Sequence, residues 1–145
     1  MTARESCPRK LDSTVCCSCS GGNGVGLRTY MGSFTPTGTG NGSIIGIGFE
    51  PKMIKFEWGY ATSLASNTAV AIGHYEASTG NMHLLASYYS VGTSGRYVSR
   101  SACIGLTTTG AAYTLGTVTS TNADGFDYNI SIFGGAQEFF FECWG

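Results

Sequence analysis

The chain has 145 residues, of which 42% are hydrophobic and only 12% are charged, and its formal net charge is −1. This length normally makes one domain that buries its own core, and the near-neutral charge gives no basic face for the phosphates of DNA or RNA, so no nucleic-acid partner is expected. Because soluble domains usually carry about 25% charged residues, we expect a surface that is neutral and polar or hidden by neighbouring subunits.

Glycine, serine and cysteine dominate the first 26 residues, which end in Ser20-Gly-Gly-Asn-Gly-Val-Gly. Since this stretch offers little that could enter a core, it predicts an N-terminal extended arm on one domain, residues 27–145. Such an arm suits an assembly protein, because it can wrap around a neighbouring chain. The N-terminus lacks the apolar block of a signal peptide, and no stretch approaches the roughly 18 apolar residues of a membrane span. We therefore expect a chain made in the cytoplasm, with no membrane partner.

The arm holds four of the six cysteines, namely Cys7, Cys16, Cys17 and Cys19. Cys16 and Cys19 have C-x-x-C spacing, so these four thiols could form a structural zinc site, although zinc knuckles usually offer two separated pairs. Disulfides, within the arm or between subunits, are favoured over zinc for an assembly that must survive outside a cell. Free thiols are the third possibility. No other cofactor is expected.

Beyond the arm, short β-branched and aromatic runs alternate with turn residues, which is typical of a sandwich or barrel. The expected strands are 27–34, 43–47, 52–60, 69–76, 82–90, 97–105, 112–119, 126–133 and 137–144. Turns are expected at Ser78-Thr-Gly-Asn and Asn122-Ala-Asp-Gly, and Gly134-Gly135 separates the last two strands. Short turns between consecutive strands favour an antiparallel meander or Greek key. The sequence therefore predicts an all-β fold, an antiparallel β-sandwich of the jelly-roll or Ig-like kind.

The clearest strand is Lys52-Met-Ile-Lys-Phe-Glu-Trp, in which apolar and charged residues alternate. Ile54, Phe56 and Trp58 should share the face that lies in the core, with Lys55 and Glu57 on the other face. Cys103 and Cys143 fall in expected strands and are interpreted as buried small hydrophobes.

No convergent catalytic group stands out. His74 and His83 flank one turn and could face each other across a hairpin, but a third metal ligand would have to come from Glu76 or Glu50, so surface histidines are the simpler interpretation.

Asp124 and Asp127 could be paired carboxylates of a glycoside hydrolase, yet Asp124-Gly125 is a hairpin dipeptide and Asp127 alternates outward between Phe126 and Tyr128. The sequence contains no nucleophile elbow, zinc-protease, Walker A or dinucleotide motif. We therefore expect a protein that is not an enzyme.

Three stretches, read in order, carry a resemblance. Gly32-Ser-Phe-Thr is followed by Ser43-Ile-Ile-Gly-Ile-Gly-Phe-Glu-Pro-Lys-Met-Ile-Lys-Phe, later by Val118-Thr-Ser-Thr-Asn-Ala-Asp-Gly-Phe-Asp-Tyr-Asn-Ile, and the chain closes with Phe139-Phe-Phe-Glu-Cys-Trp-Gly. Residues 30–145 thus resemble a β-rich module of tailed-bacteriophage virion structural proteins, with the pattern G-x-G-F-x-P-K before one strand and T-S-x-x-A-D-G-F before another. The motif has a structural rationale, because Gly48 permits a bend, Pro51 directs the next strand and Asp124-Gly125 turns into Phe126.

The resemblance implies a place in a virion and brings no catalytic residues. The function it favours is a capsid decoration (cement) or head-fibre protein, a homotrimer or other symmetric oligomer whose arm contacts the major capsid protein or another virion protein. The short chain and the cysteine-rich arm differ from a long tail fibre. The alternative is a tail-associated receptor- or carbohydrate-binding module, in which exposed Trp58, Tyr60, Tyr88, Tyr89 or Tyr97 would stack on sugar rings.

Overall fold

The computed structural model describes residues 26–61, 68–90, 92–108 and 111–145, and within these ranges the chain contains ten strands and no helix. The strands are β1 (Thr29–Phe34), β2 (Gly40–Ile45), β3 (Met53–Ala61), β4 (Thr68–Glu76), β5 (Asn81–Ser90), β6 (Thr93–Ser99), β7 (Ile104–Thr108), β8 (Ala111–Asn122), β9 (Gly125–Ile132) and β10 (Phe139–Trp144). The predicted all-β fold class is confirmed. Residues 1–25 of the predicted arm, with its four cysteines Cys7, Cys16, Cys17 and Cys19, lie outside the described residues, so the state of these thiols stays a prediction.

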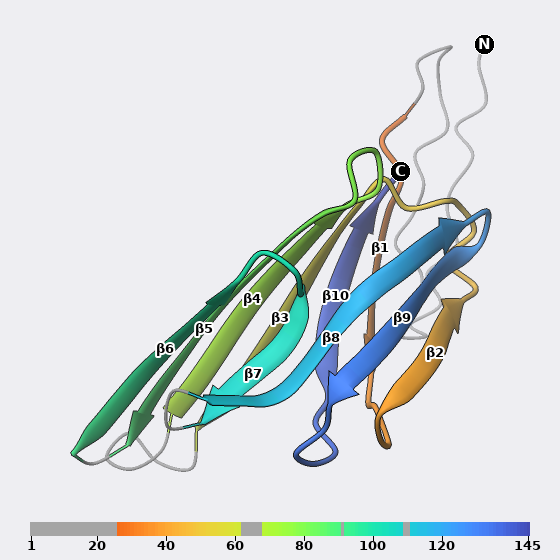
Figure 1. Ribbon diagram of the computed structural model, residues 1–145. Helices are drawn as coiled ribbons and strands as arrows, with labels where there is room; N and C mark the ends of the chain where they lie inside the picture. The colour runs from red at the N-terminus through yellow and green to blue at the C-terminus, as the bar shows by residue number, and fades with distance from the viewer. Residues whose placement is uncertain (1–25, 62–67, 91, 109–110) are drawn as a thin grey trace, which may run out of the picture.

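The strands form two antiparallel sheets that face each other (Figure 1). One sheet has six strands in the order β1-β10-β3-β4-β5-β6, and the other has four in the order β2-β9-β8-β7. Strands β3 to β6 form one meander and β7 to β9 another. The pairing of β1 with β10 and of β2 with β9 brings the first two and the last two described strands into the same half of the sandwich, as in a jelly roll.

One expected strand, 97–105, is in fact two strands in different sheets, and that prediction is corrected. The strand β6 ends at Ser99, the chain crosses between the sheets, and β7 begins at Ile104. The bend at the crossing is marked by a hydrogen bond from the amide of Ser101 to the hydroxyl of Ser99 (3.1 Å). No glycine or proline interrupts this stretch before Gly105, which is why the sequence pattern predicts a single strand.

The core lies between the sheets and is built around aromatic rings. Phe126 is fully buried and packs edge-on against Phe56 and Phe141, with ring centroids 5.8 and 5.3 Å apart. Ile54, Phe56 and Trp58 are all buried, which confirms the predicted inner face of β3. The prediction that Trp58 could be an exposed sugar-stacking residue is therefore wrong, since alternation along the strand turns it inward.

Cys103 and Cys143 are fully buried free thiols, as predicted. Burial raises the pKa of each to about 12, so both remain protonated. Opposite Cys103, the strand β4 carries Gly73, where any Cβ would collide with the carbonyl oxygen of Cys103. This close approach lets the crossing between β6 and β7 lie directly against the six-stranded sheet.

The two glycine-containing motifs that carry the sequence resemblance, one with Gly48 and one with Asp124-Gly125, contact each other in the structure. The turn between β8 and β9 is the two-residue hairpin Ala123-Asp124, and the Asp124 carboxylate accepts hydrogen bonds from the amides of Gly46 (3.1 Å) and Gly48 (2.8 Å). Gly48 has φ +80°, so the predicted bend is confirmed. The backbone carbonyl of Asp124 also accepts a hydrogen bond from Ile47 (3.0 Å). We call these contacts the Asp124 clamp; they fix the loop after β2 to the β8–β9 hairpin.

The structure also contains the other two predicted turns. The hairpin between β4 and β5 is confirmed, with Gly80 at φ +68° and its amide bonded to the carbonyl of Glu76 (2.9 Å). The Gly134-Gly135 pair does separate the last two strands, but the loop that contains it passes from the four-stranded to the six-stranded sheet.

Candidate protein-interaction surface

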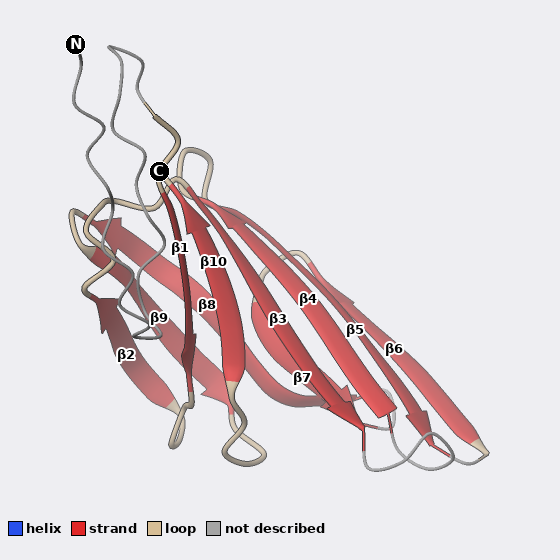
Figure 2. Cartoon of the chain, turned by 180° about the vertical axis from the view of Figure 1, so that it is seen from behind, coloured by secondary structure: helices blue, strands red, loops and turns tan. Residues whose placement is uncertain are grey.

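The side of the six-stranded sheet that points away from the core is covered by no other described element (Figure 2). Because side chains alternate across a strand, the register of the sheet decides which residues lie there. We call this surface the outer face. Its larger side chains are Met31 on β1; Phe140, Glu142 and Trp144 on β10; Met53, Lys55 and Glu57 on β3; Val70, Ile72, His74 and Glu76 on β4; His83, Leu85 and Tyr89 on β5; and Arg96 and Val98 on β6. Glycine and small polar residues, namely Thr29, Ser33, Gly59, Thr68, Asn81, Ser87 and Ser94, complete it.

The outer face is unusually apolar for a surface. Of the eleven large hydrophobic side chains that the described residues expose, eight lie on it: Met31, Met53, Val70, Ile72, Leu85, Tyr89, Val98 and Phe140. Ile72, Leu85 and Val98 lie directly opposite one another on β4, β5 and β6. Exposed apolar patches of several hundred square ångströms mark contact sites in other proteins, so the outer face is the candidate interaction surface.

We call the line of residues that crosses the middle of the outer face the central row. Register places Phe140, Glu57, Ile72, Leu85 and Val98 side by side on five neighbouring strands. Their exposed fractions reach 69% at Val98 and 52% at Leu85, so the row is open to solvent across the sheet. The side chains are held by paired backbone on rigid strands and need no loop movement to be presented.

The row beside it begins with Met31 on β1 and is polar from there on, with Glu142, Lys55, His74 and His83. The Lys55 ammonium lies 2.6 Å from a carboxylate oxygen of Glu57 in the central row. The hydrogen bond to Glu57 is the main cause that raises the pKa of Lys55, with a smaller attraction from Glu142. The charges on this part of the outer face are therefore of both signs and partly paired within the chain.

An open groove of about 710 Å³ adjoins the outer face at its β1 end. The groove is lined by residues of β1, β2, β3 and β10, among them Met31, Ile45, Lys55, Phe140 and Glu142. Four of these five also belong to the outer face, so the groove extends that surface toward the β2 edge. Its lining combines apolar side chains with one cation and carboxylates, as the outer face does.

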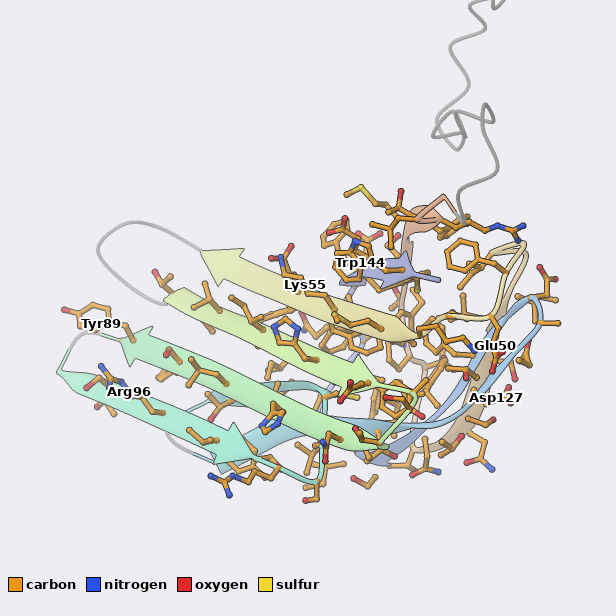
Figure 3. All side chains as sticks on the ribbon, turned by 90° about the horizontal axis from the view of Figure 1, so that it is seen from above. Glu50, Lys55, Tyr89, Arg96, Asp127 and Trp144 are labelled. Carbon is orange, nitrogen blue, oxygen red and sulfur yellow. The ribbon has the colours of Figure 1, made fainter. Side chains whose placement is uncertain are left out.

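The four tyrosines proposed as a binding surface are not presented together. Tyr88 and Tyr97 are half-buried against the core, because they share the inner face of β5 and β6 with buried Ala86. Tyr89 is 55% exposed on the outer face, toward the far end of β5 (Figure 3). The side chain of Tyr60 lies outside the description.

The two histidines lie directly opposite each other on β4 and β5, as expected for a hairpin, and both are exposed. Glu76 accepts a hydrogen bond from the Thr79 hydroxyl (2.7 Å), and Glu50 pairs with Lys52 (2.7 Å). In the part of the chain that the structure describes, no three His, Cys, Asp or Glu side chains are grouped to hold a metal ion.

Asp124 and Asp127 have structural roles. The turn interpretation of Asp124 is confirmed, because Ala123 and Asp124 form the two-residue turn between β8 and β9. The Asp127 carboxylate accepts hydrogen bonds from Ser43 (2.5 Å) on β2 and Ser120 (2.8 Å) on β8, and these two bonds lower its pKa. It therefore ties three neighbouring strands together.

Sequence reasoning did not find the outer face. The sequence does contain a sign of it in Ala69-Val-Ala-Ile, where the residues on both faces of the strand are apolar, as in a strand that is covered on both sides. Val70 and Ile72 belong to the outer face, while Ala69 and Ala71 are buried inside. The same double-sided apolar pattern in β5 places Leu84 inside and Leu85 outside.

Comparison with models of known families, with curated proteins and with solved structures finds no match for this chain. The resemblance to phage virion modules thus remains a prediction from the sequence. Within the described ranges, no helix is long and apolar enough to span a bilayer.

Proposed function

We propose that this chain is a structural protein that acts by packing against other protein chains, most specifically a capsid decoration (cement) or head-fibre protein of a tailed phage. The observation that carries the proposal is the outer face, on which eight large hydrophobic side chains are exposed along one sheet. The virion setting rests on the sequence resemblance.

The physical mechanism is burial of apolar surface at many equivalent contacts. Each square ångström of apolar surface removed from water contributes about 25 cal/mol, which makes covering this face strongly favourable. A decoration protein binds in many copies, so modest affinity per copy adds up by avidity across a particle. The N-terminal arm, which precedes β1, would contact the major capsid protein or another virion protein, and would lose its conformational freedom only on docking.

The sugar-binding alternative has less support. Two of its four tyrosines, Tyr88 and Tyr97, are turned toward the core, and Trp58 is buried. A stacking platform needs aromatic rings exposed side by side, whereas Tyr89 is the one tyrosine of the set with a described, exposed side chain.

The test is the copy number of the chain in particles sedimented from lysates of cells that naturally make it, measured by quantitative mass spectrometry against the major capsid protein. We expect copies in a fixed ratio to the capsid protein, numbering hundreds per particle. Absence from particles would overturn the proposal. A few copies per particle together with binding to cell-wall glycans would establish the receptor-binding alternative instead.

A further inference from the structure

We propose that the outer face is covered by a second copy of the same chain, stacked sheet on sheet about a two-fold axis. This inference rests on the proposed function, because it names the partner of the same surface. It leaves the four-stranded sheet free to contact other virion proteins.

The size of the face fits this partner. Six strands about 4.8 Å apart make a sheet about 29 Å wide, and strands of about eight residues at 3.3 Å per residue make it about 26 Å long. The resulting area is about 800 Å², which is what each partner buries in a stable interface of standard size. The sheet alone thus offers each copy about the area of a standard interface.

The distribution of apolar groups also fits. The central row lies in the middle of the face, with Ile72 near its centre and Phe140 and Val98 toward its two ends. A two-fold axis that lies between two stacked sheets and passes over Ile72 brings the central row of one copy onto that of the other. The four hydrophobic residues of each row, Phe140, Ile72, Leu85 and Val98, then lie over the row of the other copy, as residues on the inner faces of a sandwich do at a spacing of about 10 Å.

The charges do not oppose self-association. Lys55 and Glu57 are paired 2.6 Å apart within one copy, so closing the face leaves neither of them as an unpaired buried charge. Glu142 lies on β10 and Arg96 on β6, close to opposite edges of the sheet, where Figure 3 shows Arg96 at the rim. Glu76 is the last residue of β4, at the end of the sheet. Charges at the rim stay hydrated, and a face that carries both signs does not repel its copy.

The experiment is sedimentation velocity of the purified full-length chain over about 1 to 100 μM, a range chosen to bracket a micromolar dissociation constant. Leu85→Asp places a charge in the central row. The matched control is Ile132→Asp, because Ile132 is also an exposed hydrophobe (42%) but lies in the four-stranded sheet. Circular dichroism and thermal melting show whether each variant is folded; should Leu85→Asp be unfolded, Val98→Asp on the edge strand β6 replaces it.

We expect a dimer for the wild type and for Ile132→Asp, and a dissociation constant raised about 30-fold or more for Leu85→Asp. A wild-type monomer at every concentration, a trimer, or an undiminished dimer in the folded Leu85→Asp variant would overturn the inference. A monomer that is still incorporated into particles would sink the inference and leave the proposed function standing. A dimer that is absent from particles would support the inference and overturn the proposed function.

Discussion

Replacing Asp124 with alanine removes the carboxylate that joins two segments 78 residues apart in the sequence. Its oxygens accept hydrogen bonds from the amides of Gly46 (3.1 Å) and Gly48 (2.8 Å). A hydrogen bond to a charged group is worth about 1.5 to 3 kcal/mol. All three residues are exposed, so water replaces part of what is lost, and the expected cost is about 2 kcal/mol of unfolding free energy. For a domain of this size that corresponds to a fall in Tm of roughly 8 °C.

The assay is urea and thermal unfolding followed by circular dichroism. Asp124→Asn keeps one acceptor oxygen and the turn preference, so it should fall between the wild type and Asp124→Ala. Glu138→Ala, which removes an exposed acid from the β9–β10 loop, is the matched control and should change stability by less than about 0.5 kcal/mol. An Asp124→Ala protein as stable as Glu138→Ala would refute the reasoning that the clamp holds the loop.

Three further predictions concern titration, reactivity and packing. Two serine hydroxyls lower the pKa of Asp127, so the stability it contributes is complete above the unfolded-state pKa of about 3.9 and is lost as the pH falls through the lower folded value. Asp127→Asn should therefore reduce the loss of unfolding free energy at acid pH, as measured by urea unfolding. An unchanged pH dependence would contradict the conclusion that the hydrogen bonds to Asp127 stabilise the fold. Cys103 and Cys143, with pKa raised to about 12, should resist iodoacetamide in the folded protein and react in urea, as read by peptide mass mapping; rapid labelling without urea would contradict their burial. Gly73→Ala should cost about 3 kcal/mol or more because its Cβ meets backbone, whereas Gly59→Ala, with open space around it, should be tolerated; equal stability of the two variants would show that the crossing is not packed as described.

The fold class was predictable because alternation and turn chemistry are local signals. In β3, Lys55 and Glu57 separate the apolar residues, so the inner face could be assigned from the sequence alone. The break between β6 and β7 could not be assigned in this way. The only turn-forming residues at this break are two serines, Ser99 and Ser101, and the residues on both sides favour strands.

The candidate surface was harder to predict, for a physical reason. Where both faces of a strand are apolar, as in β4 and β5, periodicity no longer tells which side meets the core and which meets a partner. Tyr88 and Tyr89 illustrate this: as neighbours on one strand they must point to opposite faces, but only the register shows that Tyr88 faces inward. The long-range Asp124 clamp likewise depends on strand order, which local patterns do not determine.

The central claim is that other protein chains cover the outer face when the protein performs its function. Hydroxyl-radical footprinting of the chain, in its native particles and as the Leu85→Asp variant in solution, tests this directly. Met31, Met53 and Phe140, which are 63%, 47% and 55% exposed in the isolated chain, should be strongly protected in the assembled state and oxidised in the variant. Oxidation of these three residues to the same extent in both samples would contradict the account.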